Sequence, residues 1–161
     1  MYFGYPAAHE DDAQQAVRTG LEILKGFQSL NAQLPPLMRA RLSHPLQVRI
    51  GIHTGLVVVG KVSGAKGELL AVGQTPNIAA RIQGHAAPDT VAISEATHRL
   101  VEGLFECEDS GRPELKGIST TLMLYRVVKR GEAQSRFEVA VHKGLTPLVG
   151  RAEELVLLQR H

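Results

Sequence analysis

Cysteine, aromatic side chains and long apolar runs are all scarce in this chain. Cys107 is the only cysteine among 161 residues, so an intramolecular disulfide is impossible and a reducing cytoplasm is the expected location. We interpret its thiol as a packing group rather than a nucleophile. No apolar run is long enough to cross a bilayer, and the N-terminal residues lack the basic and apolar regions of a secretion signal. We therefore expect no membrane partner.

The composition also argues against nucleic acid as a partner. The formal net charge is only +2, and the 18 Lys and Arg residues are scattered without a basic run. Three Tyr, four Phe and no Trp leave little material for a surface on which bases could stack. A hydrophobic fraction of 43% with 21% charged residues is ordinary for one globular domain. A small phosphorylated ligand remains compatible with this balance.

Hydrophobic periodicity predicts the first elements of the fold. The opening residues, MYFGY, are typical of a strand that Pro6 ends. Apolar residues in steps of three and four then predict an amphipathic helix from about His9 to Leu30, ended by Pro35 and Pro36. We expect a loop or a frayed helical extension from there to Pro45.

A hairpin is expected next, over the sequence QVRIGIHTGLVVVGKV. Val48, Ile50 and Ile52 alternate with polar residues or glycine, and a Thr-Gly pair then leads into a second apolar run. Gly51 and Gly60 lie inside these strands, which indicates close backbone approach or a bulge.

Further elements alternate along the rest of the chain. The pattern predicts a strand at 69–72, a helix to about Gly84, a strand at 90–94, a helix from the cap Ser94 to Leu104, and three short strands over 105–128. The class is therefore α+β, with a mostly antiparallel sheet and helices packed on it.

The sequence VGQTPNIAARIQ is the strongest candidate for a binding site. Gly73 permits a tight turn, Thr75 can cap the helix, and Pro76 fits its first position. Asn77 and Arg81 then lie one turn apart on one face. A helix start favours anions, and a guanidinium group can grip a phosphoryl group in two places. The same pair would also suit a plain solvated face, so neighbouring motifs must decide between the two interpretations.

Five separated blocks, in order, resemble the catalytic domain of class III adenylate and guanylate cyclases. They are YFGYP followed by HEDDAQQAV, VRIGIHTGLVVVG, LAVGQTPNIAARIQ, ELKG and LYRV. The resemblance covers residues 1 to about 128 and implies a ferredoxin-like, palm-like cyclase homology fold that lacks its first strand or strands. It also implies the family's reaction, in which the ribose 3′ oxygen attacks the α-phosphorus of a nucleoside triphosphate. The products are a cyclic 3′,5′ monophosphate and pyrophosphate.

The resemblance assigns roles to four residues. Asn77 would orient the ribose, and Arg81 would contact the phosphate where charge develops. Lys116, in ELKG, matches a lysine that can hold the terminal phosphates, although a plain surface lysine is an equal alternative. Leu70 stands where the best-studied members carry Asp or Thr to read the purine edge. An aliphatic side chain exchanges no hydrogen bond with a base, so ATP is only the default substrate and GTP the less favoured one.

The resemblance further implies Mg²⁺ or Mn²⁺, held by two aspartates that precede YFGYP in the family. This chain begins after both, so we expect no metal ligands in it and no cyclase activity from the fragment alone. Asp11 and Asp12 belong to the start of the following helix, where they complement its dipole. His53 is interpreted as a surface or hydrogen-bonded residue, because no second ligand lies at metal-binding spacing.

The tail differs in composition from the rest. Residues 129–161 are expected to form a polar linker, KRGEAQSR, and the start of a missing ATPase module, because LTPLVGRAEEL resembles the segment that introduces that module in bacterial cyclase–ATPase proteins. A short helix is expected around Glu153 to Leu158, and no P-loop occurs before His161.

Two functions remain open. The first is part of a cyclase whose complete form is a homodimer, with the Asn and Arg of one chain facing the aspartates of the other. The second is a non-catalytic module that dimerises and regulates an attached ATPase. Asn77 and Arg81 favour the first function, whereas Leu70 and the missing aspartates favour the second.

Overall fold

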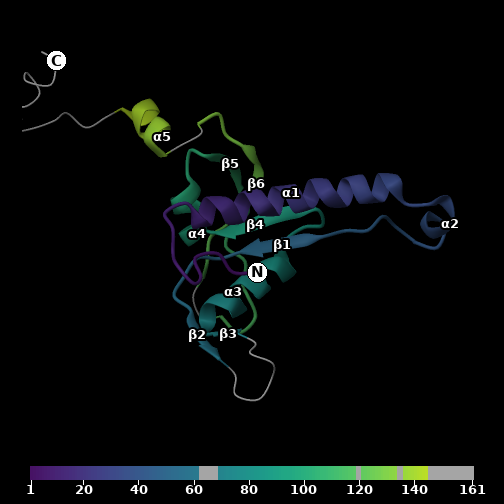
Figure 1. The fold of residues 1–161 in the computed structure, drawn as a ribbon, viewed down its shortest axis with the longest axis horizontal. Helices are drawn as coiled ribbons and strands as arrows, with labels where there is room; N and C mark the ends of the chain where they lie inside the picture. Colours follow the sequence, from purple (N-terminus) through teal and green to yellow (C-terminus); the bar gives the residue numbers. More distant parts are fainter. Residues whose placement is uncertain (62–68, 119–120, 134–135, 145–161) are drawn as a thin grey trace, which may run out of the picture.

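The computed structural model describes residues 1–61, 69–118, 121–133 and 136–144 (Figure 1). The helices are α1 (Asp12–Gln33), α2 (Pro36–Arg39), α3 (Gln74–His85), α4 (Glu95–Val101) and α5 (Arg136–Lys143). The strands are β1 (Arg49–Ile52), β2 (Val58–Lys61), β3 (Leu69–Val72), β4 (Thr90–Ser94), β5 (Phe105–Asp109) and β6 (Leu124–Arg130). In the described part of the chain, no helix is long and apolar enough to cross a membrane.

A four-stranded sheet in the order β1-β4-β6-β5 forms the centre of the molecule. Strand β1 pairs with β4 in parallel, whereas β4 with β6 and β6 with β5 are antiparallel. Strands β2 and β3 form a separate antiparallel pair. The α+β class with a mostly antiparallel sheet is therefore confirmed.

The two faces of the sheet are covered by different helices. Alternate residues of a strand point to opposite faces, and β4 is buried along four of its five residues. Val91 and Ile93 pack with Val17 of α1, whereas Ala92 packs with Ile82 of α3. The molecule thus has two small cores, with α1 and α4 on one side of the sheet and α3 on the other (Figure 1).

The amphipathic helix is confirmed with shifted ends, since α1 runs from Asp12 to Gln33 and stops before Pro35. A single helical turn, α2, follows in the stretch for which we expected a loop or a frayed extension. Arg39 of α2 turns back and donates to the carbonyl oxygens of Asn31 and Ala32 at 3.2 and 3.1 Å. This arginine therefore satisfies carbonyl groups that the end of α1 leaves without helical partners.

The hairpin expected over residues 47–62 is wrong. Strand β1 pairs with β4, and β2 pairs with β3, the next strand along the chain. Hydrophobic alternation locates strands, but the partner depends on where the connecting segment leads. Here His53 and Thr54 are hydrogen-bonded to residues at the start of α4, which directs the chain away from β1.

The two glycines of that segment behave differently. A Cβ added to Gly51 would lie 2.2 Å from the backbone nitrogen of Gln83, so close backbone approach is confirmed there. Among the described residues, a Cβ added to Gly60 would meet nothing within 4 Å, and the pairing of β2 with β3 is regular at Gly60, so neither close approach nor a bulge is found there.

The strand expected for residues 1–5 is also absent from the structure. Met1 and Tyr2 are 90% and 56% exposed, and Gly4 has φ +84°, a left-handed conformation that interrupts an extended backbone. The first residues instead form an irregular segment that lines a pocket beside β1.

The last part of the domain contains two strands rather than three in the residues described. The segment between β5 and β6 is irregular where it is described, with Gly111 and Gly117 at φ +79°. Helix α4, expected to reach Leu104, ends at Val101. Strand β6 continues to Arg130, and Val139 of α5 packs against the core on the α1 side. The helix expected near Glu153 and the sequence LTPLVGRAEEL lie outside the described residues.

Candidate functional site

The N-cap residue of helix α3 is a glycine, which has no side chain to cap the helix. Gly73 occupies the N-cap position with φ +133°, as a tight turn requires, and no side-chain hydrogen bond caps α3 in the described structure. The expectation that Thr75 caps the helix is wrong, because α3 starts at Gln74, two residues before the expected first residue Pro76. Pro76 is consequently the third helical residue, where its missing N–H still costs no helical bond. The hydroxyl of Thr75 instead donates to the carbonyl oxygen of Leu56 at 2.7 Å.

Asn77 and Arg81 are both exposed and lie one turn apart on α3. The buried side of the same helix is anchored by Ile82, which is fully buried against the sheet. Asn77 Nδ2 makes a long 3.4 Å hydrogen bond to the carbonyl oxygen of Gly73. No ion pair holds Arg81 within the residues that the structure describes. Both side chains are therefore available to a ligand.

The backbone of α3 rests directly on that of β1. Gly51 makes this possible, because its missing side chain would also lie 2.5 Å from the carbonyl oxygen of Ala79. Helix and strand can approach so closely only where one residue has no Cβ. The position of Asn77 and Arg81 relative to the sheet is thus fixed by a backbone contact.

Lys116 lies in an exposed turn beside α3. The neighbouring Leu115 is buried and packs with Ile82 of α3, and the amide of Ile118 donates to the carbonyl oxygen of Leu115 at 3.0 Å. Lys116 itself is exposed. The structure therefore brings the turn that carries Lys116 to the helix that carries Asn77 and Arg81.

Leu70 lies on β3, where it is paired with Gly60 of β2. Strand β3 ends at Val72 and leads through Gly73 directly into α3. The conformation of the Leu70 side chain is outside what the structure describes. A base-facing role for Leu70 stays a prediction.

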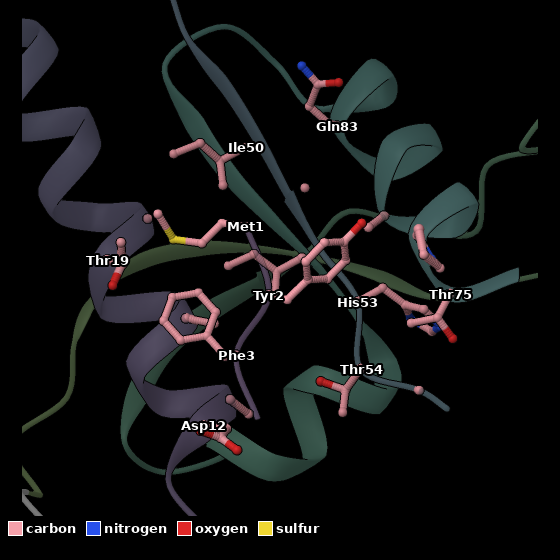
Figure 2. Close-up of a pocket in the computed structure, with 18 of the residues that line it drawn as sticks. Met1, Tyr2, Phe3, Asp12, Thr19, Ile50, His53, Thr54, Thr75 and Gln83 are labelled. Atoms are coloured by element: carbon pink, nitrogen blue, oxygen red, sulfur yellow. The ribbon is translucent and has the colours of Figure 1, made fainter. Parts of the chain in front are cut away.

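A pocket of about 410 Å³ opens between α1, β1 and the start of α3. Figure 2 shows His53 and Thr75 close together on one side of it, with Tyr2 and Phe3 of the N-terminal segment facing them from the other. Thr54 and Gly55, which follow His53, also line the pocket. The residues directly after β1 and the first turn of α3 therefore form one wall of this pocket.

His53 is hydrogen-bonded, as the sequence predicted. Its Nδ1 lies 2.8 Å from Oγ of Ser94, the residue that caps α4. Burial lowers the pKa of His53 below its usual value, because the protonated ring is less well solvated in the protein. The hydroxyl partners Thr54, Ser94 and Thr97 were not recognised from the sequence as parts of a site. Only the cap role of Ser94 had a local signal, and the structure confirms it.

The metal expected from the family does not fit the described residues. No group of three or more His, Cys, Asp and Glu side chains lies together in that part of the chain. Asp11 accepts a hydrogen bond from Gln15 Nε2, which lowers its pKa, and Asp12 accepts one from the amide of His9. Both carboxylates thus form hydrogen bonds at the start of α1.

Cys107 behaves as a packing residue. It is half buried against the core, and burial raises the pKa of its thiol from an ordinary 9.0 to about 11. The thiolate fraction at pH 8 should therefore be lower by a factor of about 100 than for a free thiol, since each pKa unit changes it about tenfold. We expect iodoacetamide to alkylate the folded chain at pH 8 about 100-fold more slowly than the urea-unfolded chain. Equal rates would show that the thiol is neither buried nor inert.

Nucleotide cyclases are among the solved structures with a similar fold. The adenylyl cyclase CyaB from P. aeruginosa is 31% identical, with a TM-score of 0.69 over 79% of this chain and 65% of that chain. The guanylyl cyclase Cya2 is 28% identical, with a TM-score of 0.69 over 83% of this chain and 66% of that chain. The family model "Adenylate and Guanylate cyclase catalytic domain" matches residues 1–129. The chain therefore belongs to the adenylate and guanylate cyclase catalytic domain family.

Two curated relatives are much longer than the part of them that matches this chain. Guanylate cyclase soluble subunit beta-2 from Rattus norvegicus is 30% identical over 115 residues, which is 71% of this chain and 16% of the relative. Uncharacterized protein R02095 from Rhizobium meliloti is 31% identical over 148 residues, which is 91% of this chain and 14% of the relative. The chain thus spans less than a fifth of the length of either.

Proposed function

We propose that this chain supplies the ribose- and phosphate-binding half of a nucleotide cyclase. The observation that carries the proposal is the exposed pair Asn77 and Arg81, one turn apart on a helix whose backbone rests on β1. Catalysis of this kind depends on positioning and on stabilising charge in the transition state. Asn77 would orient the ribose so that its 3′ oxygen faces the α-phosphorus. Arg81 would bind the phosphate oxygens on which negative charge develops.

Lys116 is proposed to hold the terminal phosphates. Packing of Leu115 on Ile82 supports this role, because it keeps the exposed lysine in a turn beside α3. A lysine binds phosphate as a point charge and needs no fixed orientation. If Lys116 is only a surface residue, removing its side chain should leave the affinity of the chain for a triphosphate unchanged.

The proposed substrate is ATP, with GTP less favoured. Both adenylyl and guanylyl cyclases are among the structures that resemble this chain. Leu70, proposed to face the base, offers no hydrogen-bonding group to either purine. Selection of ATP would therefore depend on backbone groups or on residues outside the described part.

The complete protein is proposed to act as a cytoplasmic homodimer that uses Mg²⁺ or Mn²⁺. No group of three or more His, Cys, Asp and Glu side chains lies together in the described residues, so the metal would be held by carboxylates elsewhere, facing Asn77 and Arg81 across the dimer. Residues 1–128 would form the cyclase domain, and 129–161 a linker into an ATPase module. The end of the family match at residue 129 supports that boundary.

We expect the purified chain to show no cyclase turnover by itself. Asn77 and Arg81 can bind substrate, but without metal-binding carboxylates nothing in the proposed half activates the 3′ hydroxyl. The test is formation of cyclic AMP and cyclic GMP from ATP and GTP, with Mg²⁺ and with Mn²⁺. Clear turnover by the chain alone would contradict the expectation.

A second candidate is a non-catalytic module that dimerises and regulates an attached ATPase. Leu70, which stands where the best-studied members of the family carry Asp or Thr, favours it. The two candidates differ in ligand binding. A cyclase half binds ATP or GTP through Asn77 and Arg81, whereas a module kept for dimerisation alone binds neither.

A further inference from the structure

Four polar side chains form a closed hydrogen-bonded group where the chain leaves β1. His53 Nδ1 lies 2.8 Å from Ser94 Oγ, and Ser94 Oγ lies 3.3 Å from Thr97 Oγ1. Thr97 Oγ1 in turn lies 3.0 Å from Thr54 Oγ1. Because His53 and Thr54 are consecutive, these contacts close a ring, which we call the hydroxyl cluster (His53, Thr54, Ser94 and Thr97).

Two of the four members of the hydroxyl cluster are buried, whereas His53 is partly buried and Thr54 is exposed. Ser94 and Thr97 are the two buried polar residues in the described part of the chain, and both are 0% exposed. A buried hydroxyl without a hydrogen-bond partner is destabilising, and each hydroxyl here has one proton and two lone pairs to place. Ser94 also accepts from the amide of Thr97 at 3.4 Å. The cluster therefore ties the segment after β1 to the first turn of α4.

The same segment also holds the start of α3. Two residues beyond Thr54, the carbonyl oxygen of Leu56 accepts the hydrogen bond from Thr75, the second residue of α3. Between them, a Cβ added to Gly55 would lie 2.7 Å from Thr75 Oγ1 and 3.4 Å from His53 Nε2. Figure 2 shows His53 and Thr75 on the same side of the pocket. Residues 53–56 thus connect the hydroxyl cluster, to which His53 and Thr54 belong, with the helix that carries Asn77.

We propose that the hydroxyl cluster positions Asn77, by fixing residues 53–56 as the support on which Thr75 holds the first turn of α3. Its members are positioning residues, because they act on Asn77 through Leu56 and Thr75. Neutral imidazole suits this task, since the burial that disfavours the charged ring keeps Nδ1 free to exchange a hydrogen bond with Ser94 in either direction. The inference rests on the proposed function only in that Asn77 is the residue positioned for substrate.

The decisive variant is Thr97→Val, which keeps the side-chain shape and removes the hydroxyl at the centre of the cluster. Amide hydrogen exchange at Asn77, Ile78 and Ala79 reports the result, since i→i−4 bonding makes these the first amides of α3 with a helical acceptor. Loss of a hydrogen bond of ordinary strength predicts about fivefold faster exchange there. Exchange at Val17, a fully buried residue of α1, serves as the reference for global unfolding.

Two matched variants separate positioning from general destabilisation. Thr97→Ser loses a buried methyl group but keeps the hydroxyl, so exchange at the start of α3 should stay at its original rate relative to Val17. Thr90→Val makes the same substitution at the first residue of β4, at the end of the strand away from Ser94. The hydroxyl of Thr90 donates to the carbonyl oxygen of Ala87 at 2.8 Å and is not part of the hydroxyl cluster. This variant should also leave α3 unchanged.

Faster exchange at Asn77–Ala79 in Thr97→Val alone supports the proposal. Unchanged exchange in that variant, or an equal increase in Thr97→Ser or Thr90→Val, overturns it. Binding of ATP to the same proteins tests the consequence for Asn77, with weaker binding expected for Thr97→Val only. If the unmodified chain binds no ATP, the proposed function fails, whereas the exchange result still decides whether the cluster positions α3.

Discussion

Gly51→Ala is expected to lower the free energy of unfolding by about 3 kcal/mol, the upper part of the range for overpacking a core. The added Cβ would lie 2.2 Å from the nitrogen of Gln83 and 2.5 Å from the oxygen of Ala79. Both atoms belong to the backbone of α3, so no side-chain rotation can relieve the overlap, and the helix must move off β1. For a domain of this size the midpoint of thermal unfolding should fall by about 10 °C.

The matched control for this prediction is Gly84→Ala, the same substitution on the helix that Gly51 contacts. A Cβ at Gly84 would meet nothing within 4 Å, and alanine favours a helix interior over glycine by about 1 kcal/mol. This variant should unfold at the same temperature as the unmodified chain or slightly above it. Circular dichroism melts of the three proteins provide the measurement. Equal melting of the two variants would mean that α3 does not rest on β1 in solution.

Local sequence signals were sufficient for helix α1 and for the cap of α4. The periodic apolar stripe predicted α1, whose Ala13, Ala16 and Val17 are buried, and the serine before Glu95 predicted the cap of α4. Strand pairing is not specified in this way. Val48, Ile50 and Ile52 indicated a strand, yet nothing local distinguishes pairing with the next strand from pairing with β4, about forty residues later.

In the candidate site, too, local features could be predicted from the sequence, whereas contacts between distant residues could not. Asn77 and Arg81 could be proposed from their spacing on a predicted helix, because one turn separates them along the chain. The contacts that hold that helix join residues far apart in sequence. Thr75 contacts Leu56 across 19 positions, and His53 contacts Ser94 across 41. Threonine and serine are common and have several structural uses, so no pattern in the sequence marks these residues as partners.

Gly51 is an intermediate case. A glycine inside a strand predicted that some other backbone comes close, and the structure identifies that backbone as α3. Gly60 carried the same signal without such a neighbour. The signal therefore locates a possible contact, and only the arrangement of β1 and α3 decides which glycine makes it. In this chain Gly51 makes the contact, and the contact fixes the position of α3, the helix that carries Asn77 and Arg81.

Arg81→Lys is expected to weaken binding of ATP by the chain about tenfold, although the charge is retained. A guanidinium group can donate two parallel hydrogen bonds to one phosphoryl group, whereas an ammonium group acts as a point charge. Loss of one charge-assisted hydrogen bond corresponds to about 1.4 kcal/mol, or a factor of ten in Kd. Isothermal titration with ATP, with inorganic tripolyphosphate and with adenosine measures the effect. The first two ligands should bind more weakly to the variant, and adenosine should bind as before.

The control for Arg81 is Arg99→Lys, the same substitution at another exposed helical position. Arg99 lies on α4 and is paired with Glu95 one turn earlier, an arrangement that contributes little to stability. Its replacement should leave the affinity for ATP unchanged. If lysine at position 81 binds ATP and tripolyphosphate as tightly as arginine does, the guanidinium makes no two-pronged contact with phosphate. If adenosine binding falls together with the other two, the substitution has disturbed α3 rather than a phosphate contact, and the role proposed for Arg81 is wrong.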